Sequence, residues 1–340
     1  MNLEKKVSVW LTINRACNLR CEWCYAKYTG FRSNDDMLDD IVEKALNVMG
    51  DLNVKSVVLI GGEPTVHPNF LSIVSMLANS GVKVKILTNV VKFSDEKFLI
   101  KSIKAGIGSL AISLKASNRE DYVKFTGSDC FEKAIVAIKN INKHGVSNAI
   151  NITACKDSFD NFQEMIDVVV ENGGKTISID TGRPIVTYNG VIMNNMGTPR
   201  EMADFFINLH PMIKKSRLEF SFKIGIPLCL FPKSFLDEAI KEKIILSGCQ
   251  MAMEKGLIID TDGKIIPCNH MCHIPLGKIG EDFSNAEEYW QFRKRKDVSS
   301  FYDFNKMCPS EKCKDCEYWK FCGGGCKLYW LCYSASEMIG

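Results

Sequence analysis

Three cysteines near the N-terminus have the spacing of a metal-binding loop. Cys17, Cys21 and Cys24 form a C-x3-C-x2-C pattern directly after the apolar run 7–13. Three thiolates on one short loop can hold three irons of a [4Fe–4S] cube and leave the fourth iron without a protein ligand. A zinc site would need a fourth closing ligand, or histidine and carboxylate ligands, and the loop has no histidine. The pattern therefore predicts an iron–sulfur cluster with one reactive iron.

A second motif, Gly61-Gly62-Glu63-Pro64, follows the apolar run 57–60. Paired glycines let the backbone approach a ligand closely. The turn and the Glu63 carboxylate also offer acceptors to an ammonium group. A β-turn before a helix would explain the same residues if the motif stood alone.

Ten of the fifteen cysteines lie in the last 112 residues. In chain order they are Cys229, Cys249, Cys268, Cys272, Cys308, Cys313, Cys316, Cys322, Cys326 and Cys332. Because the N-terminus has no apolar signal core, we expect a cytoplasmic protein whose thiols stay reduced and bind metal. A zinc ribbon built from Cys313, Cys316, Cys322 and Cys326 is one alternative.

The elements that must position these residues alternate between strand and helix over 7–181. Strand-like runs cover 54–60, 82–87, 109–114, 149–153 and 176–180, and helical spacing covers 35–49, 68–79, 95–104, 131–143 and 159–171. This alternation predicts a parallel sheet with right-handed crossovers. A loop over 183–197, a helix over 199–214 and a strand over 218–224 interrupt it, and 257–266 reads as a β-hairpin with an Asp-Gly turn.

Ligands of parallel α/β sheets lie at the carboxyl ends of the strands. That rule selects Asn89, Ser113, Lys115 and Asp180, each of which follows or ends a predicted strand. Thr88, Thr153, Cys155, Thr181 and Arg183 lie at equivalent places. A polar residue that merely closes a strand is the plain alternative for each.

Composition excludes several classes of function. The chain has 340 residues, 46% hydrophobic content and a net charge of +3, without a basic block that would indicate a nucleic-acid surface. No apolar run approaches the roughly 20 residues of a membrane span. We expect neither a nucleic acid nor a membrane as partner.

The cysteine spacing, with Trp23 before the third cysteine, and the Gly-Gly-Glu-Pro turn resemble the signatures of radical S-adenosylmethionine (radical SAM) enzymes. The resemblance implies a partial (β/α)6 TIM-like barrel over 1–225. It also implies that S-adenosylmethionine binds the open iron and yields a 5′-deoxyadenosyl radical. The residues expected to contact it are Trp23, Gly61, Gly62, Glu63, Pro64, Asn89 and Ser113. In the family a glycine often follows the asparagine, whereas this chain has Val90.

The C-terminal cysteines resemble the SPASM extension of radical SAM enzymes, which we expect over 226–340. The match consists of Gly263-x4-Cys268, then C-x2-C-x5-C-x3-C and a terminal cysteine. It implies two auxiliary iron–sulfur clusters, most simply [4Fe–4S]. The first auxiliary set is Cys249, Cys268 and Cys326, with Cys229, Cys272 or the substrate as fourth ligand, and the second auxiliary set is Cys313, Cys316, Cys322 and Cys332. Cys130 and Cys308 are expected to be ordinary buried thiols.

SPASM relatives mostly modify ribosomally made peptides, so the leading hypothesis is oxidative modification or cross-linking of a peptide. A separate leader-recognition protein would then assist, because only about six residues precede the first strand. A flavodoxin or ferredoxin would supply the electron. Sulfatase maturation is a weaker alternative, because Asn269 stands where such enzymes have an aspartate base.

Two other enzyme classes stay open. Epimerisation of a peptide residue or a sugar needs a thiol as hydrogen donor, for which Cys229 or Cys155 is available. Dehydrogenation of a small alcohol needs a base, for which Asp180 or Lys115 is available.

Overall fold

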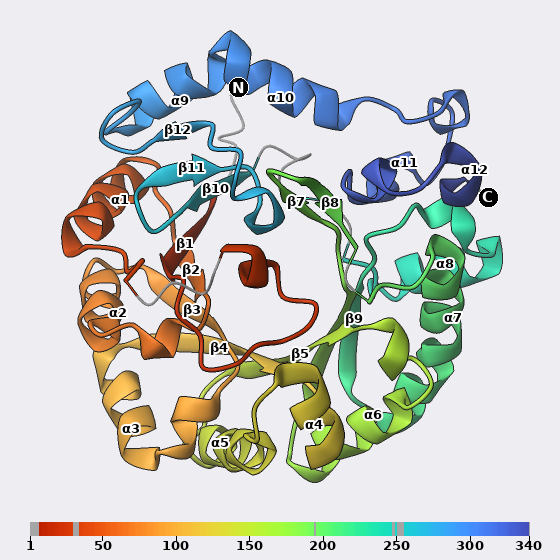
Figure 1. Cartoon of the computed structure of the whole chain (residues 1–340), viewed down its shortest axis with the longest axis horizontal. Coiled ribbons are helices and arrows are strands. Elements are labelled where there is room, and N and C mark those ends of the chain that lie inside the picture. Colours follow the sequence, from red (N-terminus) through yellow and green to blue (C-terminus); the bar gives the residue numbers. More distant parts are fainter. Residues whose placement is uncertain (1–6, 30–33, 194, 247–248, 250–254, 340) are drawn as a thin grey trace.

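A curved sheet of ten strands organises the molecule. The computed structural model describes residues 7–29, 34–193, 195–246, 249 and 255–339. The strand order is β12-β11-β10-β1-β2-β3-β4-β5-β6-β9, and Figure 1 shows these strands curving into an incomplete ring with helices outside it. The α/β class and the partial barrel predicted from the sequence are confirmed.

The strands of this sheet are short. They are β1 (Ser8–Asn14), β2 (Ser56–Gly61), β3 (Lys83–Thr88), β4 (Ile107–Leu114), β5 (Asn148–Ala154), β6 (Thr176–Thr181), β9 (Glu219–Lys223), β10 (Gly256–Ile259), β11 (Lys264–Ile266) and β12 (Gly277–Lys278). A separate hairpin consists of β7 (Ile185–Thr187) and β8 (Gly190–Ile192).

The helices are α1 (Asp39–Asp51), α2 (Phe70–Asn79), α3 (Glu96–Ala105), α4 (Arg119–Thr126), α5 (Phe131–Lys143), α6 (Phe162–Glu171), α7 (Pro199–Ser216), α8 (Lys233–Lys241), α9 (Ala286–Lys294), α10 (Lys296–Lys306), α11 (Trp319–Cys322) and α12 (Ala335–Met338). The predicted helices are found as α1, α2, α3, α5, α6 and α7, whereas α4 and the helices after α7 were not predicted. None of the helices in the described ranges is long and apolar enough to span a membrane.

The parallel part of the sheet is longer than the six predicted units. Strand β9 pairs in parallel with β6, and β10 pairs in parallel with β1. Strand β10 comes from the cysteine-rich C-terminal part of the sequence, so this part is built into the same sheet. The predicted hairpin at 257–266 is confirmed as β10 and β11.

The two faces of the sheet differ in chemistry. Ile177 and Ile179 of β6 are fully buried, and the partners of Ile179 on β5 and β9, Ile152 and Phe222, are buried too, whereas Ser178 and Asp180 occupy the opposite face. On that face Ser178 accepts a hydrogen bond from Ser221 at 3.1 Å. Strands alternate their side chains between faces, so one face packs under the helices and the other gives the barrel a polar interior.

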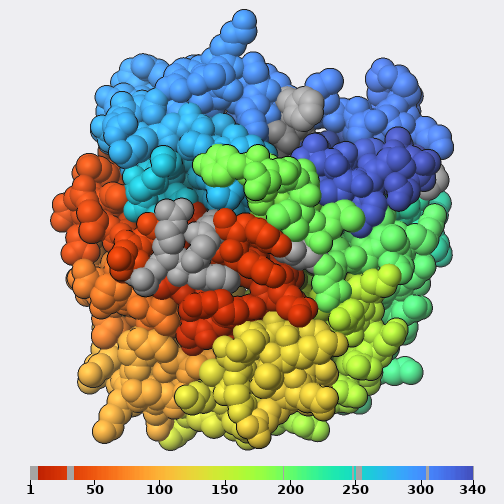
Figure 2. Space-filling view, viewed as in Figure 1, coloured from red at the N-terminus to blue at the C-terminus, as the bar shows by residue number. Residues whose placement is uncertain are grey.

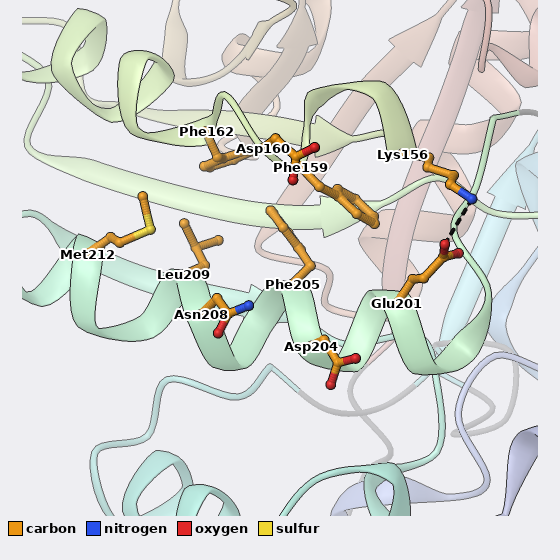
Figure 3. A pocket seen from close by; sticks show the side chains of 10 residues that line it. All are labelled: Lys156, Phe159, Asp160, Phe162, Glu201, Asp204, Phe205, Asn208, Leu209 and Met212. Carbon is orange, nitrogen blue, oxygen red and sulfur yellow. Dashed lines mark ion pairs between the residues drawn. The ribbon is translucent and has the colours of Figure 1, made fainter.

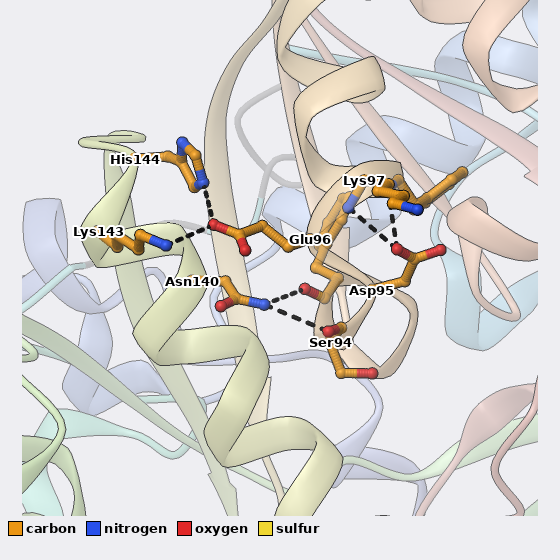
Figure 4. Close-up of polar contacts among 9 residues, drawn as sticks. Ser94, Asp95, Glu96, Lys97, Asn140, Lys143 and His144 are labelled. Carbon is orange, nitrogen blue, oxygen red and sulfur yellow. Dashed lines mark hydrogen bonds and ion pairs between the residues drawn. The ribbon is translucent and has the colours of Figure 1, made fainter.

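Polar contacts at the start of α3 fix the turn that follows β3. The Asn140 amide donates to the carbonyls of Phe93 and Ser94 at 3.1 and 3.3 Å (Figure 4). Glu96 binds Lys143 and His144 at 2.8 and 2.7 Å. Helix α5 therefore holds the segment that leads from β3 past the predicted Asn89 site.

Candidate functional site

The loop that carries the first three cysteines is hydrogen-bonded to helix α4. The backbone N–H of Arg20 donates to the Thr126 carbonyl at 2.8 Å, and that of Glu22 donates to Phe125 at 3.0 Å. Trp23 is buried and packs edge-on against Phe125, with ring centroids 5.8 Å apart. Figure 2 shows this N-terminal segment in red at the centre of the face, between α4 and the C-terminal segments.

The three cysteines have the chemistry of metal ligands. Burial raises the pKa of the Cys17 thiol to about 12 and that of Cys24 to about 11. Burial also raises the pKa of Cys21, which the nearby Lys115 ammonium opposes. Because a buried thiolate is costly without a cation, these thiols become ligands only when a metal compensates their charge. Lys115 supplies a further positive charge to the same site.

The described thiols do not form a compact site for a single zinc ion. Sulfurs that share a tetrahedral zinc lie about 3.8 Å apart, given Zn–S bonds of roughly 2.3 Å. Within the described residues, no three cysteine sulfurs lie within 4.8 Å of one another. This holds for the N-terminal loop and for the alternative zinc ribbon at the C-terminus.

The Gly-Gly-Glu-Pro turn packs closely against residues 14–16, at the start of the cysteine loop. A Cβ atom on Gly61 would lie 2.2 Å from Asn14 Oδ1, and one on Gly62 would lie 2.2 Å from the Ala16 carbonyl oxygen. The N–H groups of Gly62 and Glu63 donate to the carbonyls of Asn14 and Ala16 at 3.0 and 2.8 Å. The glycines are therefore required because the turn is bound to the start of the cysteine loop.

Glu63 is buried and uses both carboxylate oxygens within the protein. Oε1 accepts from the Thr65 and Thr88 hydroxyls, each at 2.7 Å, and Oε2 accepts from the Asn89 N–H at 2.7 Å. Burial raises the pKa of Glu63, which these donors oppose. The carboxylate thus joins the ends of β2 and β3 and is engaged within the protein.

Asn89 lies against the cysteine loop. Its amide donates to Asn18 Oδ1 at 2.8 Å and lies 3.9 Å from Cys17 Sγ. Val90 has φ of 59°, in the left-handed region that favours glycine. The backbone conformation that the family's glycine would adopt is therefore kept here by a β-branched residue.

The other predicted barrel residues fall into two places. Lys115 donates to Ser113 Oγ at 2.6 Å, and its ammonium lies 5.8 Å from the centre of the Trp23 ring, beside the cysteine loop. Asp180 pairs with Arg183 at 2.8 Å on the other side of the barrel interior. The structure brings Ser113 and Lys115 to the first cluster site, and Asp180 to a different one.

Three interior contacts were missed by the sequence reasoning. Lys223, at the end of β9, donates to Asn151 Oδ1 at 3.0 Å, and burial lowers the pKa of its ammonium. Arg15 forms a buried ion pair with Asp260, which follows β10. The Thr12 hydroxyl donates to Asn269 Oδ1 at 3.3 Å, so residue 269 faces the barrel interior. Polar residues within apolar strands were the available signal, since Lys223 ends β9 and Asn151 lies in the middle of β5.

The first auxiliary set forms a group in space. Burial raises the pKa of the Cys268 thiol to about 12, and neighbouring Cys249 and Cys326 raise it further. Burial raises the pKa of Cys326 to about 11, whereas nearby Arg183 lowers it. Arg183 therefore links this set to Asp180 in the barrel.

The second auxiliary set gathers around Cys313. Burial raises the pKa of its thiol, followed by the charges of Cys229, Cys308 and Cys316. Cys322 is likewise within electrostatic range of Cys229, and its sulfur accepts from the Leu228 N–H at 3.3 Å.

Cys313 and Cys322, which lie within electrostatic range of Cys229, both belong to the second auxiliary set. Their positions favour Cys229 as a neighbour of that set over the first auxiliary set. Burial alone raises the pKa of Cys332. Cys308 is exposed, so the expectation of a buried thiol is wrong for it, because it sits at the surface near Cys313. Cys130 is half-buried.

A hollow of the described surface lies elsewhere. A cavity of about 290 Å³ lies between α6 and α7 (Figure 3). Its lining includes Phe159, Phe205 and the Lys156–Glu201 ion pair, with none of the predicted site residues. Its position separates it from the cysteine sites.

Comparisons with known proteins agree with this geometry. Residues 11–169 match the family model of the radical SAM superfamily. The chain is 27% identical over 212 residues to a probable GTP 3′,8-cyclase of Thermococcus kodakarensis, covering 60% of this chain and 64% of that protein. It is 24% identical over 337 residues to the AdoMet-dependent heme synthase of Methanosarcina barkeri, covering 92% and 88%.

Two solved structures share the fold. Native anSMEcpe with bound AdoMet and Cp18Cys peptide has a TM-score of 0.71 at 19% identity, covering 98% of this chain and 92% of that one. Streptococcus suis SuiB bound to precursor peptide SuiA has a TM-score of 0.73 at 18% identity, covering 99% and 75%. Together with the cysteine loop and the sheet, these findings show a radical SAM domain over residues 11–169, followed by a cysteine-rich C-terminal region.

Proposed function

We propose that this radical SAM enzyme oxidatively modifies a peptide, most simply by cross-linking residues of a ribosomally made precursor. The observation that carries the proposal is the position of Arg183, which pairs with Asp180 at 2.8 Å in the barrel and lies within electrostatic range of Cys268 and Cys326 of the first auxiliary set. Hydrogen abstraction leaves a substrate radical, and a net oxidation needs a nearby acceptor for its second electron. With its clusters bound, the chain would gain a hydrogen-abstracting 5′-deoxyadenosyl radical at the N-terminal loop and electron acceptors at the auxiliary cysteines.

The protein's own residues would orient the reactants. Ser113 and Lys115 lie beside the first cysteine loop, where the ammonium would hold the carboxylate of S-adenosylmethionine. Asp180 would accept the proton that an oxidised substrate releases, because its carboxylate lies on β6 of the barrel, where it pairs with Arg183. Lys223 and Asn151 would contact the substrate from β9 and β5.

A peptide substrate is supported by the structural neighbours. The SuiB and anSMEcpe structures each contain a peptide, and this chain shares their fold over nearly its full length. A leader-recognition partner and a small redox protein such as flavodoxin or ferredoxin complete the proposed system.

Epimerisation is the second candidate, because one thiol lies near the reactive loop. Cys155 is buried at the end of β5 within electrostatic range of Glu22, and so could return hydrogen to a substrate radical. Cys229 is exposed and lies near Cys313, a less suitable place for a hydrogen donor.

The test uses anaerobically reconstituted full-length protein, S-adenosylmethionine, a reductant and short peptides encoded beside the gene. Oxidative modification predicts 5′-deoxyadenosine formation and loss of two hydrogens from the peptide. Epimerisation in D₂O instead predicts 5′-deoxyadenosine formation and replacement of one carbon-bound hydrogen of the peptide by deuterium, with no net loss of two hydrogens. The Cys17/Cys21/Cys24→Ala variant is the control that should form no 5′-deoxyadenosine. Peptides that stay unmodified while 5′-deoxyadenosine forms would refute the choice of a peptide substrate.

A further inference from the structure

Polar side chains cross the barrel interior from β5 to β9 in two rows. In the first row the sheet register aligns Asn151, Ser178 and Ser221, on β5, β6 and β9. In the second row, one step nearer the carboxyl ends of the strands, it aligns Asp180 with Lys223. Because side chains alternate between the faces of a strand, both rows lie on the same face of the sheet. We call these five residues the polar floor of the barrel.

The side chain of Lys223 reaches across the polar floor. Its ammonium donates to Asn151 Oδ1 at 3.0 Å, although β6 lies between β9 and β5. Neighbouring strands are about 4.8 Å apart, so this hydrogen bond joins side chains that are two strand spacings apart. The Asn151 amide nitrogen donates to the Ala149 carbonyl at 3.2 Å, which leaves the amide oxygen for the lysine. The ammonium is therefore held over the floor and away from the outer edge of β9.

This ammonium forms no ion pair among the described residues. Asp180 is its neighbour in the register, but both carboxylate oxygens have other donors. Oδ1 accepts from the Thr181 N–H at 2.9 Å, and Oδ2 accepts from Arg183 at 2.8 Å. The acceptor of Lys223 is the neutral amide of Asn151. A buried charge normally has an opposite charge beside it, so the site lacks an anion.

The charges around Lys223 are mostly positive. Burial lowers the pKa of its ammonium, Asp180 opposes this shift, and Arg183 and Lys85 add to it. Of these four side chains, only Asp180 is an anion, and Arg183 already pairs with it. A carboxylate that enters the barrel would be attracted by the remaining positive charge. It would also accept a charge-assisted hydrogen bond from Lys223.

We propose that Lys223 selects substrates that carry a carboxylate group, which binds the ammonium over the polar floor. The inference rests on the peptide substrate of the proposed function and adds its chemical class. The carboxylate is an acidic side chain or a free carboxyl terminus close to the residue that reacts. Lys115 serves a different place, because it donates to Ser113 at 2.6 Å and lies beside Trp23 of the cysteine loop. The barrel thus has one lysine for S-adenosylmethionine and another for the substrate.

The experiment measures peptide binding separately from turnover. Full-length protein, reconstituted anaerobically, is immobilised with S-adenosylmethionine and without reductant. The probes are two libraries of random hexapeptides that contain every amino acid except cysteine, one with free and one with amidated carboxyl termini. Mass spectrometry identifies the retained peptides. Enrichment of aspartate and glutamate in the amidated library would support the proposal with a side chain as the carboxylate, and retention confined to free termini would support it with the terminus.

Variants then assign the preference to the lysine. Lys223→Met should weaken the binding of an enriched peptide roughly 10- to 100-fold, as expected for the loss of a hydrogen bond to a charged group. Lys223→Arg should keep the preference, because arginine stays charged and cannot act as a base. Asn151→Asp should abolish it with Lys223 intact, because the aspartate would supply the missing carboxylate from within the protein. The matched control Lys139→Met removes an equal charge from the exposed side of α5 and should change nothing.

The outcomes distinguish this inference from the proposed function. Iron content and urea midpoint show whether each variant folds, and Lys223→Arg and Asn151→Asp keep the test valid if Lys223→Met does not. Peptides retained without preference for a carboxylate would overturn the inference and leave the peptide substrate standing. A preference that survives Lys223→Met or Asn151→Asp would also overturn it, because the carboxylate would then bind elsewhere. Retention of no peptide by the wild type would refute the peptide substrate, and the inference with it.

Discussion

The buried ion pair between Arg15 and Asp260 should be the most stabilising single polar contact of the site. Arg15 directly follows β1 and lies two residues before Cys17, whereas Asp260 directly follows β10. Their side chains are 4% and 11% exposed. Nη1 of Arg15 is buried and already has no hydrogen-bond partner, so the guanidinium depends on Asp260 for compensation of its charge.

Asp260→Asn leaves this guanidinium charged and buried without an opposite charge. Removing one partner of a buried pair costs about 3–5 kcal/mol. Because the asparagine oxygen still accepts a hydrogen bond, we expect the lower end of this range. The matched control is Asp129→Asn in the Arg119–Asp129 pair, whose side chains are 68% and 53% exposed. Exposed pairs contribute about 0–1 kcal/mol.

The assay is the urea midpoint of anaerobic, reconstituted protein, read by pulse proteolysis. The double variant Arg15→Met/Asp260→Asn should lose less stability than Asp260→Asn alone, because it removes the uncompensated charge. A midpoint shift for Asp260→Asn no larger than that for Asp129→Asn would refute the reasoning. So would strictly additive effects of the two substitutions at the pair.

Three further changes test the local geometry. Gly62→Ala should abolish the N-terminal cluster, lowering iron content by about four per chain, because its Cβ would strike the loop backbone. Val90→Gly should destabilise less than Val90→Ala in the urea assay, since the left-handed conformation costs a side chain roughly 1–2 kcal/mol; the reverse order would contradict the strained backbone. Lys143 and His144 lower the pKa of Glu96, so its stabilising effect is present above the unfolded pKa of about 4.3 and is lost as pH falls through the lower folded value. The difference in urea midpoint between wild type and Glu96→Gln should therefore vanish in acid, and a constant difference would argue against the ion pair.

The fold class could be predicted from the sequence because the periodicity of apolar residues is a local property. Apolar residues spaced two apart predict strands, and apolar residues spaced three and four apart predict helices. The structure confirms the strands predicted from β1 to β6 and the helices predicted between them. The pairing of β10 with β1 could not be read in the same way. It joins segments about 250 residues apart, and no residue within either strand specifies its partner.

Site residues show the same division between local and distant causes. The Gly-Gly-Glu-Pro motif was recognisable, but its physical basis depends on Asn14 and Ala16, which only the folded chain brings near. Glu63 looked like a ligand because a carboxylate at a turn is usually free, whereas three donors from β3 and the turn occupy it here. Cys308 looked like a structural thiol because the sequence holds no information on its exposure.

The pairing of β10 with β1 also bears on how the two kinds of cysteine site work together. Because these strands share a ladder, the segments that follow them stay in fixed contact, as the Arg15–Asp260 pair and the Thr12–Asn269 hydrogen bond show. The His270 ring then packs on Tyr25, one residue after Cys24. The separation between the reactive loop and the first auxiliary set is therefore set by the sheet, not by a flexible linker. Under the proposed function, a substrate radical formed at the barrel mouth would meet its electron acceptor at a fixed distance, as a net oxidation requires.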